Sequence, residues 1–344
     1  MRASILRGPK DVAVEERSRP RPGPREVLVR VGSVGVCGSD IHYYEHGRIG
    51  HFVVEQPLVL GHEASGVIEE LGQEVSSLSA GQRVSIEPGV PDLTCPQCLA
   101  GRYNLCPDMR FFATPPIDGA FAEYVVVHAS FAHPIPDSMS DDAAALLEPL
   151  SVGVWACRKA GVTAGSRVLI TGAGPVGLVS LQTALAFGAQ EVAVSDVNPA
   201  RLAVAAELGA TQTIDARTGS LADLTAAPDI LLECSGFPPA IADGIRALDR
   251  AGRAVLVGMG GDEVPLPLAV IQERELTVTG TFRYANTWPT AIGLVSSGRV
   301  NLDRLVTGSY PLDDVEGALT ASRRDAGTIK VMVHPNGSTT SAAG

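Results

Sequence analysis

The stretch Val168-Leu-Ile-Thr-Gly172-Ala-Gly174-Pro-Val-Gly177 is the strongest indication of the fold, because it places a G-x-G-x-x-G pattern directly after an apolar run typical of a buried strand. The amphipathic run Leu178–Phe187 that follows predicts a helix. In this arrangement the first glycine permits a tight turn, the second lets backbone approach a pyrophosphate, and the third lets helix and strand pack closely. The stretch therefore predicts the first strand, turn and helix of a dinucleotide-binding domain.

An acidic residue supports this interpretation. Asp196 ends the next predicted strand and lies 19 residues beyond Gly177, where a carboxylate can bind the ribose hydroxyls of the adenosine. The same charge would repel the 2′-phosphate of NADP, so we expect NAD as the cofactor. Arg201 could soften that preference, although a helix-surface arginine explains it equally well.

Beyond Arg158 strands alternate with helices, which predicts an α/β domain with a doubly wound parallel sheet. A helix after the second strand is marked by Asn198 as N-cap and Pro199 at the first helical position. The expected parallel strands are Val168–Thr171, Val192–Ser195, Ile230–Glu233 and Ala254–Val257.

The first third of the chain has a different pattern, with short β segments separated by Gly and Pro clusters. It predicts a β-rich domain followed by an Ala/Leu-rich helical stretch from Asp141 to Arg158. We expect this domain to comprise residues 1–150 and 284–344, and the dinucleotide domain residues 151–283. The β segments include Glu26–Val31, Gly66–Leu71 and Tyr124–His128, and the returning part is expected to hold helices near Trp288–Ser297 and from Asp313, a strand Ile329–Val333 and a disordered tail from Asn336.

The composition excludes several classes of protein. The 344 residues carry a formal net charge of −11, which argues against nucleic acid or an anionic membrane as a partner. With 45% hydrophobic and 19% charged residues the chain is not expected to be disordered. No export signal is visible near the N-terminus, and glycines interrupt the uncharged run Val168–Gln190. We therefore expect a cytoplasmic location.

Three residues of the β-rich part have the chemistry of a metal site. Cys37, His62 and Glu63 combine a thiolate, an imidazole and a carboxylate, which suits a catalytic zinc with one position open for water or substrate. Each residue alone could be structural, since buried cysteines are common and histidines are often hydrogen-bonded within the protein without binding a metal. Their occurrence beside a nucleotide-binding fold favours the metal.

A second cluster has the spacing Asp92-x2-Cys95-x2-Cys98-x7-Cys106. Three thiolates and a carboxylate carry the same charge as four thiolates, and a carboxylate oxygen can bind zinc. The sequence thus predicts a second, structural zinc. The alternative is a lobe that has lost its metal and folds through packing alone.

Four motifs make the chain resemble the zinc-dependent medium-chain alcohol dehydrogenases, and within them the polyol (sorbitol, L-iditol and xylitol) dehydrogenase branch. The resemblance covers nearly the whole chain and implies a GroES-like β-rich catalytic domain joined to a Rossmann domain. The motifs are Gly35-Val-Cys-Gly-Ser-Asp-Ile-His-Tyr-Tyr-Glu-His-Gly-Arg-Ile-Gly50, Ala113-Thr-Pro-Pro116, Leu147-Glu-Pro-Leu-Ser-Val-Gly153 and Phe282-Arg-Tyr-Ala-Asn-Thr-Trp-Pro289.

The resemblance implies roles for individual residues. Cys37, His62 and Glu63 would hold the catalytic zinc with a water, while Glu148 would contact that water or replace Glu63 as a ligand. Ser39 and His42 would relay a proton to solvent. The polyol would meet Tyr43, Phe111, Thr114, Glu148, Arg283 and Tyr284, and the cofactor Gly172, Gly174, Val176, Gly177, Asp196, Arg201, Val257, Gly258, Met259, Thr281, Phe282 and Arg283. Asp92 departs from the family pattern, which has cysteine at the first position of the structural zinc lobe.

The expected activity is oxidation of a secondary alcohol of a polyol to a ketose with NAD. Another secondary alcohol, such as threonine, a sugar acid or butanediol, is the alternative within the family, and a non-catalytic nucleotide-binding protein is the alternative outside enzymes. We expect a homotetramer, or a homodimer, joined through the edge of the cofactor-domain sheet near Glu263–Val270 and Glu275–Val278.

Overall fold

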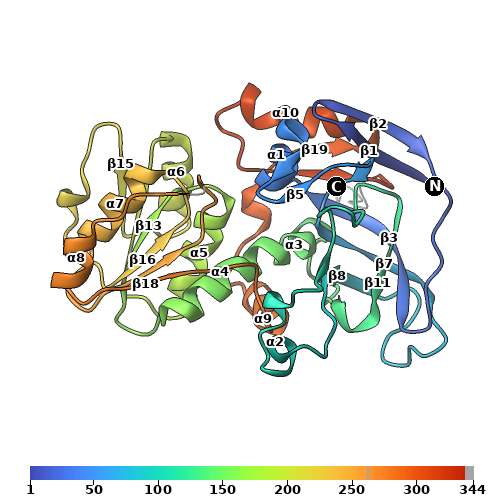
Figure 1. Cartoon of the computed structure of the whole chain (residues 1–344), viewed down its shortest axis with the longest axis horizontal. Helices are drawn as coiled ribbons and strands as arrows, with labels where there is room; N and C mark the ends of the chain where they lie inside the picture. The colour runs from blue at the N-terminus through green and yellow to red at the C-terminus, as the bar shows by residue number, and fades with distance from the viewer. Residues whose placement is uncertain (262, 338–344) are drawn as a thin grey trace. The chain divides into compact units, whose positions relative to one another are not determined.

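The structure is a computed structural model that describes residues 1–261 and 263–337. The chain divides into two compact units, coloured from blue to red along the sequence in Figure 1. Unit 1 comprises Met1–Glu148 and Leu302–Gly344, and unit 2 comprises Pro149–Asn301. The predicted disordered tail lies largely outside the described residues, since it begins at Asn336.

Unit 1 is built on a seven-stranded sheet, in the order β12-β8-β7-β3-β20-β19, with β11 also paired to β3. A three-stranded sheet, β2-β1-β6, and two short hairpins, β4-β5 and β9-β10, complete its β structure. The strands are β1 Arg2–Gly8, β2 Asp11–Glu16, β3 Glu26–Gly35, β4 Arg48–Ile49, β5 Phe52–Val53, β6 Leu58–Val59, β7 Glu63–Leu71, β8 Arg83–Ile86, β9 Gly89–Val90, β10 Arg110–Phe111, β11 Tyr124–His128, β12 Ala132–Pro134, β19 Val306–Pro311 and β20 Lys330–His334.

In the described part of unit 1, four short α-helices accompany these sheets, and they are α1 Gly38–His46, α2 Pro96–Leu99, α3 Asp141–Ala145 and α10 Val315–Arg324. The core of the unit is apolar and includes Val29, Val31 and Phe121, each fully buried. The ten-residue strand β3 lies in the middle of the large sheet, and its carboxyl end leads directly into α1. This junction positions the candidate metal site.

Unit 2 is the expected doubly wound α/β domain, with six parallel strands in the order β15-β14-β13-β16-β17-β18. Leu169 and Leu231 pack on one face against Ile241 and Ile245 of α7. The elements are α4 Leu147–Ala160, which begins in unit 1, β13 Arg167–Thr171, α5 Pro175–Ala186, β14 Glu191–Asp196, α6 Pro199–Glu207, β15 Gln212–Asp215, β16 Ile230–Glu233, α7 Pro238–Ala247, β17 Arg253–Leu256, α8 Leu268–Glu273, β18 Thr277–Gly280 and α9 Trp288–Ser296.

The second boundary differs from the expected one. The chain returns to unit 1 at Leu302 rather than at residue 284, because α9 is tied to unit 2 by hydrogen bonds. Arg158 of α4 donates to the backbone carbonyl of Asn286 and to the hydroxyl of Thr290, and Gln182 of α5 exchanges two hydrogen bonds with Asn301.

Two local predictions also need correction. The stretch expected to form one helix from Asp141 is two helices, α3 and α4, interrupted at Leu146. Pro149 explains the break, because its ring would clash with the carbonyl four residues earlier in a continuous helix. The C-terminal helix is capped by Asp314, which accepts from the N–H of Gly317, and not by Asp313, which binds Arg2.

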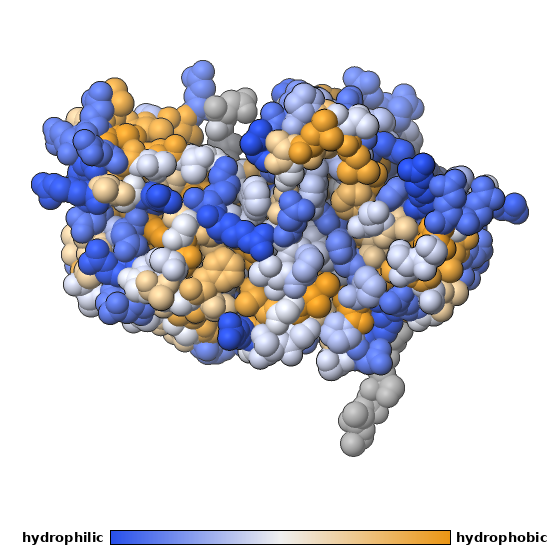
Figure 2. Space-filling model, turned by 90° about the horizontal axis from the view of Figure 1, so that it is seen from below, coloured by the Kyte–Doolittle hydropathy of each residue, from blue (hydrophilic) through white to orange (hydrophobic). Residues whose placement is uncertain are grey.

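Among the described residues no helix is both long and apolar enough to cross a membrane. The face seen in Figure 2 mixes hydrophilic and hydrophobic residues. Single exposed apolar side chains, such as Leu99 and Phe237, are ordinary on such a surface.

Candidate functional site

The three expected catalytic zinc ligands lie together in unit 1. One donor atom from each of Cys37, His62 and Glu63 lies within 4.8 Å of the others. Cys37 comes from the junction between β3 and α1, and Glu63 is the first residue of β7. His62 and Glu63 are 8% and 1% exposed, so the donors face the interior.

Two glycines make room for this arrangement. Gly35 of β3 lies opposite Glu63 of β7, and a Cβ on Gly35 would come within 2.1 Å of the Glu63 carboxylate. Gly61 precedes His62 and has a φ of 87°, a backbone conformation that residues with a side chain rarely adopt. A Cβ there would also lie 2.9 Å from Phe121. Both glycines are therefore required by the geometry of the site.

Asp40 holds two of the segments that carry the ligands. Its fully buried carboxylate accepts from the backbone N–H of Cys37 and of Gly61, each at 2.9 Å, and lies 3.7 Å from Nδ1 of His62. Burial alone would lower the pKa of His62, but the negative charges of Asp40 and Cys37 outweigh it. The pKa of His62 in the metal-free chain therefore stands well above its usual value.

Lys330 is a residue of the site that the sequence analysis missed. Its ammonium donates to both carboxylate oxygens of Glu63, at 2.7 Å and 2.8 Å, and to the carbonyl of Val36 at 2.9 Å. Burial alone would lower the pKa of Lys330, but the charges of Glu63, Cys37 and Glu148 keep it above the usual value. The available signal was one lysine in the otherwise apolar strand Ile329–Val333.

The residues fit a zinc ion. A thiolate, an imidazole and a carboxylate are donors that zinc prefers, and three protein ligands are typical of a catalytic site. Each oxygen of Glu63 has a second lone pair, so the hydrogen bonds from Lys330 do not prevent ligation. The ligand set is thus compatible with one position left for water or substrate.

Helix α1 carries three of the other expected residues. Ser39 is half-buried and His42 is exposed, so these two side chains lead from Cys37 towards the surface, whereas Tyr43 is buried. The rings of His42 and His46 lie 4.7 Å apart. These positions leave a proton relay along α1 geometrically open.

The remaining expected residues of unit 1 lie on separate segments. Phe111 of β10 is buried, and its ring centroid is 5.7 Å from that of His62. Thr114 forms an isolated bridge with Ile117. Glu148 is 5% exposed and acts electrostatically on Lys330, which places its charge near the ion pair of Lys330 and Glu63.

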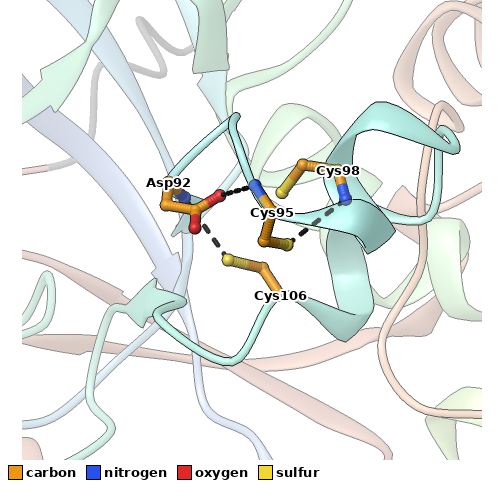
Figure 3. Close-up of side chains that lie close together, drawn as sticks. All are labelled: Asp92, Cys95, Cys98 and Cys106. Atoms are coloured by element: carbon orange, nitrogen blue, oxygen red, sulfur yellow. Dashed lines mark hydrogen bonds between the residues drawn. The ribbon is translucent and has the colours of Figure 1, made fainter.

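The second expected cluster is also assembled. Asp92, Cys95, Cys98 and Cys106 offer four donor atoms within 4.8 Å of one another, and Figure 3 shows their side chains directed towards a common centre. Asp92 Oδ1 accepts from the N–H of Thr94 and of Cys95, at 2.8 Å and 2.9 Å. All six cysteines of the chain are free, so no disulfide closes this lobe.

In the metal-free lobe the pKa of Asp92 is lowered and the pKa of Cys98 is raised. Hydrogen bonds from the backbone of Cys95 and Thr94 lower the pKa of Asp92 to about 2. Burial raises the pKa of the Cys98 thiol to about 12, and side-chain hydrogen bonds with Cys95, Asp92 and Cys106 add to this rise. A metal must therefore displace a tightly held thiol proton, whereas the carboxylate is already ionised.

The glycine-rich turn has the geometry expected for a dinucleotide. Gly172 has a φ of 92°, and a Cβ there would lie 2.9 Å from the backbone nitrogen of Ser235. A Cβ on Gly177 would come within 1.8 Å of the Gly172 carbonyl. A Cβ on Gly174, by contrast, would meet nothing within 4 Å. The first and third glycines are thus required by packing, and the second faces open space at the N-terminus of α5, where a pyrophosphate can approach.

The acidic residue of the motif lies beside this turn. Asp196 at the end of β14 accepts from the N–H of Ala173 at 2.5 Å and from that of Asn198 at 2.7 Å. Arg201 is half-buried on α6, whose N-cap is Asn198 as predicted. Val176 lies in the first turn of α5. The carboxylate of Asp196 is therefore fixed in place next to the expected ribose position.

The other expected cofactor residues follow the carboxyl ends of β17 and β18, on the same edge of the parallel sheet. Met259 and Phe282 are mostly exposed. Arg283 has a positive φ of 52° and stacks over Phe282, and the buried Tyr284 contacts Trp288. Val257, Gly258 and Met259 follow β17, and Thr281, Phe282 and Arg283 follow β18.

Comparison with known proteins agrees with this geometry. Residues 23–137 match the alcohol dehydrogenase GroES-like domain, and residues 175–297 match the zinc-binding dehydrogenase domain. Sorbitol dehydrogenase of Gallus gallus is 45% identical over 96% of this chain and 95% of its own, and that of Bos taurus is 44% identical over 96% and 94%. The structure of L-idonate 5-dehydrogenase from Escherichia coli matches with a TM-score of 0.91 and 32% identity, covering 97% of this chain and 98% of that one.

The chain therefore belongs to the zinc-dependent medium-chain alcohol dehydrogenases, as its motifs predicted. The fold of a GroES-like domain with a Rossmann-type parallel sheet is likewise confirmed. Within the family the chain resembles the sorbitol dehydrogenases over nearly its whole length.

Proposed function

We propose that this protein oxidises a secondary alcohol of a polyol to the ketose with NAD. The observation that carries the proposal is the cluster of Cys37, His62 and Glu63, with donor atoms within 4.8 Å, in a chain 44–45% identical to sorbitol dehydrogenases. Zinc and NAD are the cofactors that this family and these two sites require.

The zinc would be held by Cys37, His62 and Glu63. As a Lewis acid it would lower the pKa of an alcohol hydroxyl. Gly172, Gly174 and Gly177 would hold NAD, the hydride acceptor. Ser39 and His42 would then move the released proton outwards, because Ser39 is half-buried two residues after Cys37 and His42 is exposed.

Polyol recognition calls for hydrogen-bonding groups against a partly apolar wall. In unit 1 we assign the polar contacts to Tyr43 and Glu148 and the lining of the pocket to Phe111 and Thr114, on the resemblance to the polyol dehydrogenases. The ring of Phe111 lies 5.7 Å from that of His62, and the charge of Glu148 acts on Lys330. From unit 2 we assign Arg283 and Tyr284, on the match of their motif to the polyol dehydrogenases.

The test is NADH formation from sorbitol, xylitol, other pentitols and hexitols, threonine, a sugar acid and butanediol. We expect polyols to be the best substrates, with activity lost in Cys37→Ala. A matched control is Cys157→Ala, which removes a thiol buried in unit 2. Turnover of threonine, a sugar acid or butanediol in place of polyols would favour the second candidate, another secondary-alcohol dehydrogenase.

We also propose a structural zinc at Asp92, Cys95, Cys98 and Cys106, supported by their common centre. The protein would then carry about two zinc ions per chain. Metal analysis of fresh protein tests this, and a content of one ion would favour a lobe that folds through packing.

A homo-oligomer joined through unit 2 is our third proposal. Strand β18 is the edge of the six-stranded sheet, and Leu266 and Leu268 nearby are 41% and 64% exposed. Such an edge can pair with the same edge of a second copy. Sedimentation should give a tetramer or dimer, and a monomer at micromolar concentration would contradict the proposal.

We place the protein in the cytoplasm, without nucleic-acid or membrane partners. Six free cysteines, three of them in a metal cluster, suit a reducing compartment. Cell fractionation tests this, and recovery with an exported fraction would contradict it.

A further inference from the structure

The carboxylate of Glu233, the last residue of β16, is fully buried and is bound by neutral donors. Its Oε1 accepts from the Thr171 hydroxyl at 3.2 Å, from the Ser235 N–H at 2.9 Å and from the Gly236 N–H at 3.1 Å. The Ser235 hydroxyl also donates to Oε1, and Gly236 donates to Oε2 at 3.1 Å. A buried charge is costly, so this convergence of donors requires an explanation.

The backbone of the same residue holds a second loop. The Glu233 carbonyl accepts from the N–H of Val257 and of Gly258, each at 2.8 Å. Glu233 therefore fixes the loop after β16 with its side chain and the loop after β17 with its main chain. Both loops begin at the same edge of the parallel sheet as the glycine-rich turn, which follows β13.

These loops and the turn pack backbone against backbone. A Cβ on Gly172 would lie 2.9 Å from the nitrogen of Ser235, and one on Gly258 would lie 2.2 Å from that of Gly236. A Cβ on Gly236 would lie 2.1 Å from the Met259 carbonyl. Because no side chain separates them, a shift of the Ser235–Gly236 segment would move both neighbours.

We propose that Glu233 is a positioning residue for the dinucleotide. Its carboxylate fixes Ser235 and Gly236 between the Gly172 turn and Val257–Gly258, so that three loops form one preorganised surface for NAD. The inference rests on the proposed binding of NAD. A neutral amide cannot replace the carboxylate fully, because its NH2 group would face the N–H of Gly236 or of Ser235.

The test is Glu233→Gln in the full-length, zinc-loaded protein, with NADH binding followed by the fluorescence of the nicotinamide. We expect the dissociation constant for NADH to rise by about tenfold or more, since hydrogen bonds to the carboxylate are lost. The KM for NAD should rise with it. The kcat at saturating NAD and the zinc content should stay near the wild-type values.

Two further variants separate positioning from stability. Glu87→Gln changes another buried glutamate, in unit 1, which accepts from Tyr103 and binds His133. It should lower the melting temperature without changing NADH affinity. Ser235→Ala removes one donor to Glu233 and should weaken NADH binding by about threefold, which keeps a readout if Glu233→Gln does not fold.

Wild-type affinity for NADH in both Glu233→Gln and Ser235→Ala, with only the melting temperature lowered, would overturn the proposal and leave Glu233 a purely structural residue. If Glu233→Gln does not fold, wild-type affinity in Ser235→Ala would overturn it. Failure of the wild-type chain to bind NADH is a different result, because it would contradict the dinucleotide function itself.

Discussion

The Lys330 ammonium lies 2.7 Å and 2.8 Å from the two carboxylate oxygens of Glu63, and both side chains are almost fully buried. This pair joins β20, near the C-terminus, to the first residue of β7. It also places one positive charge beside a thiolate and a carboxylate that would bind zinc. Lys330 therefore offsets charge that would otherwise be buried unpaired when the metal is absent.

Removing this cation should destabilise the metal-free protein. Lys330→Met is expected to lower the free energy of unfolding by about 3–5 kcal/mol, because it leaves Glu63 as an uncompensated buried charge. Urea unfolding of the chelator-treated protein measures this. Lys330→Arg keeps the charge and should lose less, and equal losses in the two variants would show that shape rather than charge matters.

Zinc binding should depend on pH. In the metal-free chain the raised pKa of His62 keeps its imidazole protonated at neutral pH, so zinc binding must release that proton. Chelator competition should therefore show zinc affinity falling as the pH is lowered, by about tenfold or more per pH unit. Asp40→Asn removes the charge that raises the pKa of His62 and should flatten the dependence. An affinity independent of pH would contradict this account.

Asp196 should determine the choice between NAD and NADP. Asp196→Asn keeps an acceptor for the N–H of Ala173 and removes the charge that repels a 2′-phosphate. We expect the ratio of kcat/KM for NADP to that for NAD to rise by about tenfold or more. Arg201→Ala in the same background should reduce the gain. An unchanged ratio would assign discrimination to other residues.

The lobe metal should depend on the residue at position 92. Asp92→Ala should reduce the zinc content from about two ions per chain to about one, whereas Asp92→Cys supplies a fourth thiolate and should retain both. Metal analysis after gel filtration gives the counts. Two ions in Asp92→Ala would mean that the three cysteines suffice.

Asp142 should contribute stability that acid removes. Burial alone would raise the pKa of Asp142, but hydrogen bonds from His334 and Ser33 outweigh it, and the pKa lies below its usual value. Such a group stabilises the fold above its unfolded pKa, and the contribution is lost as pH falls through the folded pKa. Asp142→Asn should therefore cost about 2 kcal/mol at about pH 6 and much less at about pH 3. An equal loss of stability at the two pH values would contradict the expected pH dependence.

The sequence predicted the parts of the fold that have a local cause. Asn198 and Pro199 cap α6 because cap chemistry acts within one turn, and β16 matches the predicted Ile230–Glu233 because the strand is buried on both faces. The short strand β15 was missed because its sequence, Gln212–Asp215, contains no run of apolar residues. The return to unit 1 was placed too early, because the hydrogen bonds that hold α9 join residues more than 100 positions apart.

The cluster of Cys37, His62 and Glu63 was predictable because a thiol, an imidazole and a carboxylate occur together in a chain that also has a nucleotide-binding motif. Their supports were not, since Lys330 meets Glu63 across 267 residues. Asp40 and Glu233 read as an ordinary helix residue and an ordinary strand end. Only their burial and their hydrogen bonds to backbone N–H groups identify them.

Zinc held by Cys37, His62 and Glu63 would serve the oxidation of a polyol by NAD. The most direct measurement is the initial rate of NADH formation from sorbitol and xylitol as zinc is returned to chelator-treated protein, with zinc bound per chain determined at each point. We expect no rate without metal and a rate that rises in proportion to the occupancy of this site. A full rate in the zinc-free protein, or no polyol oxidation at full occupancy, would contradict it.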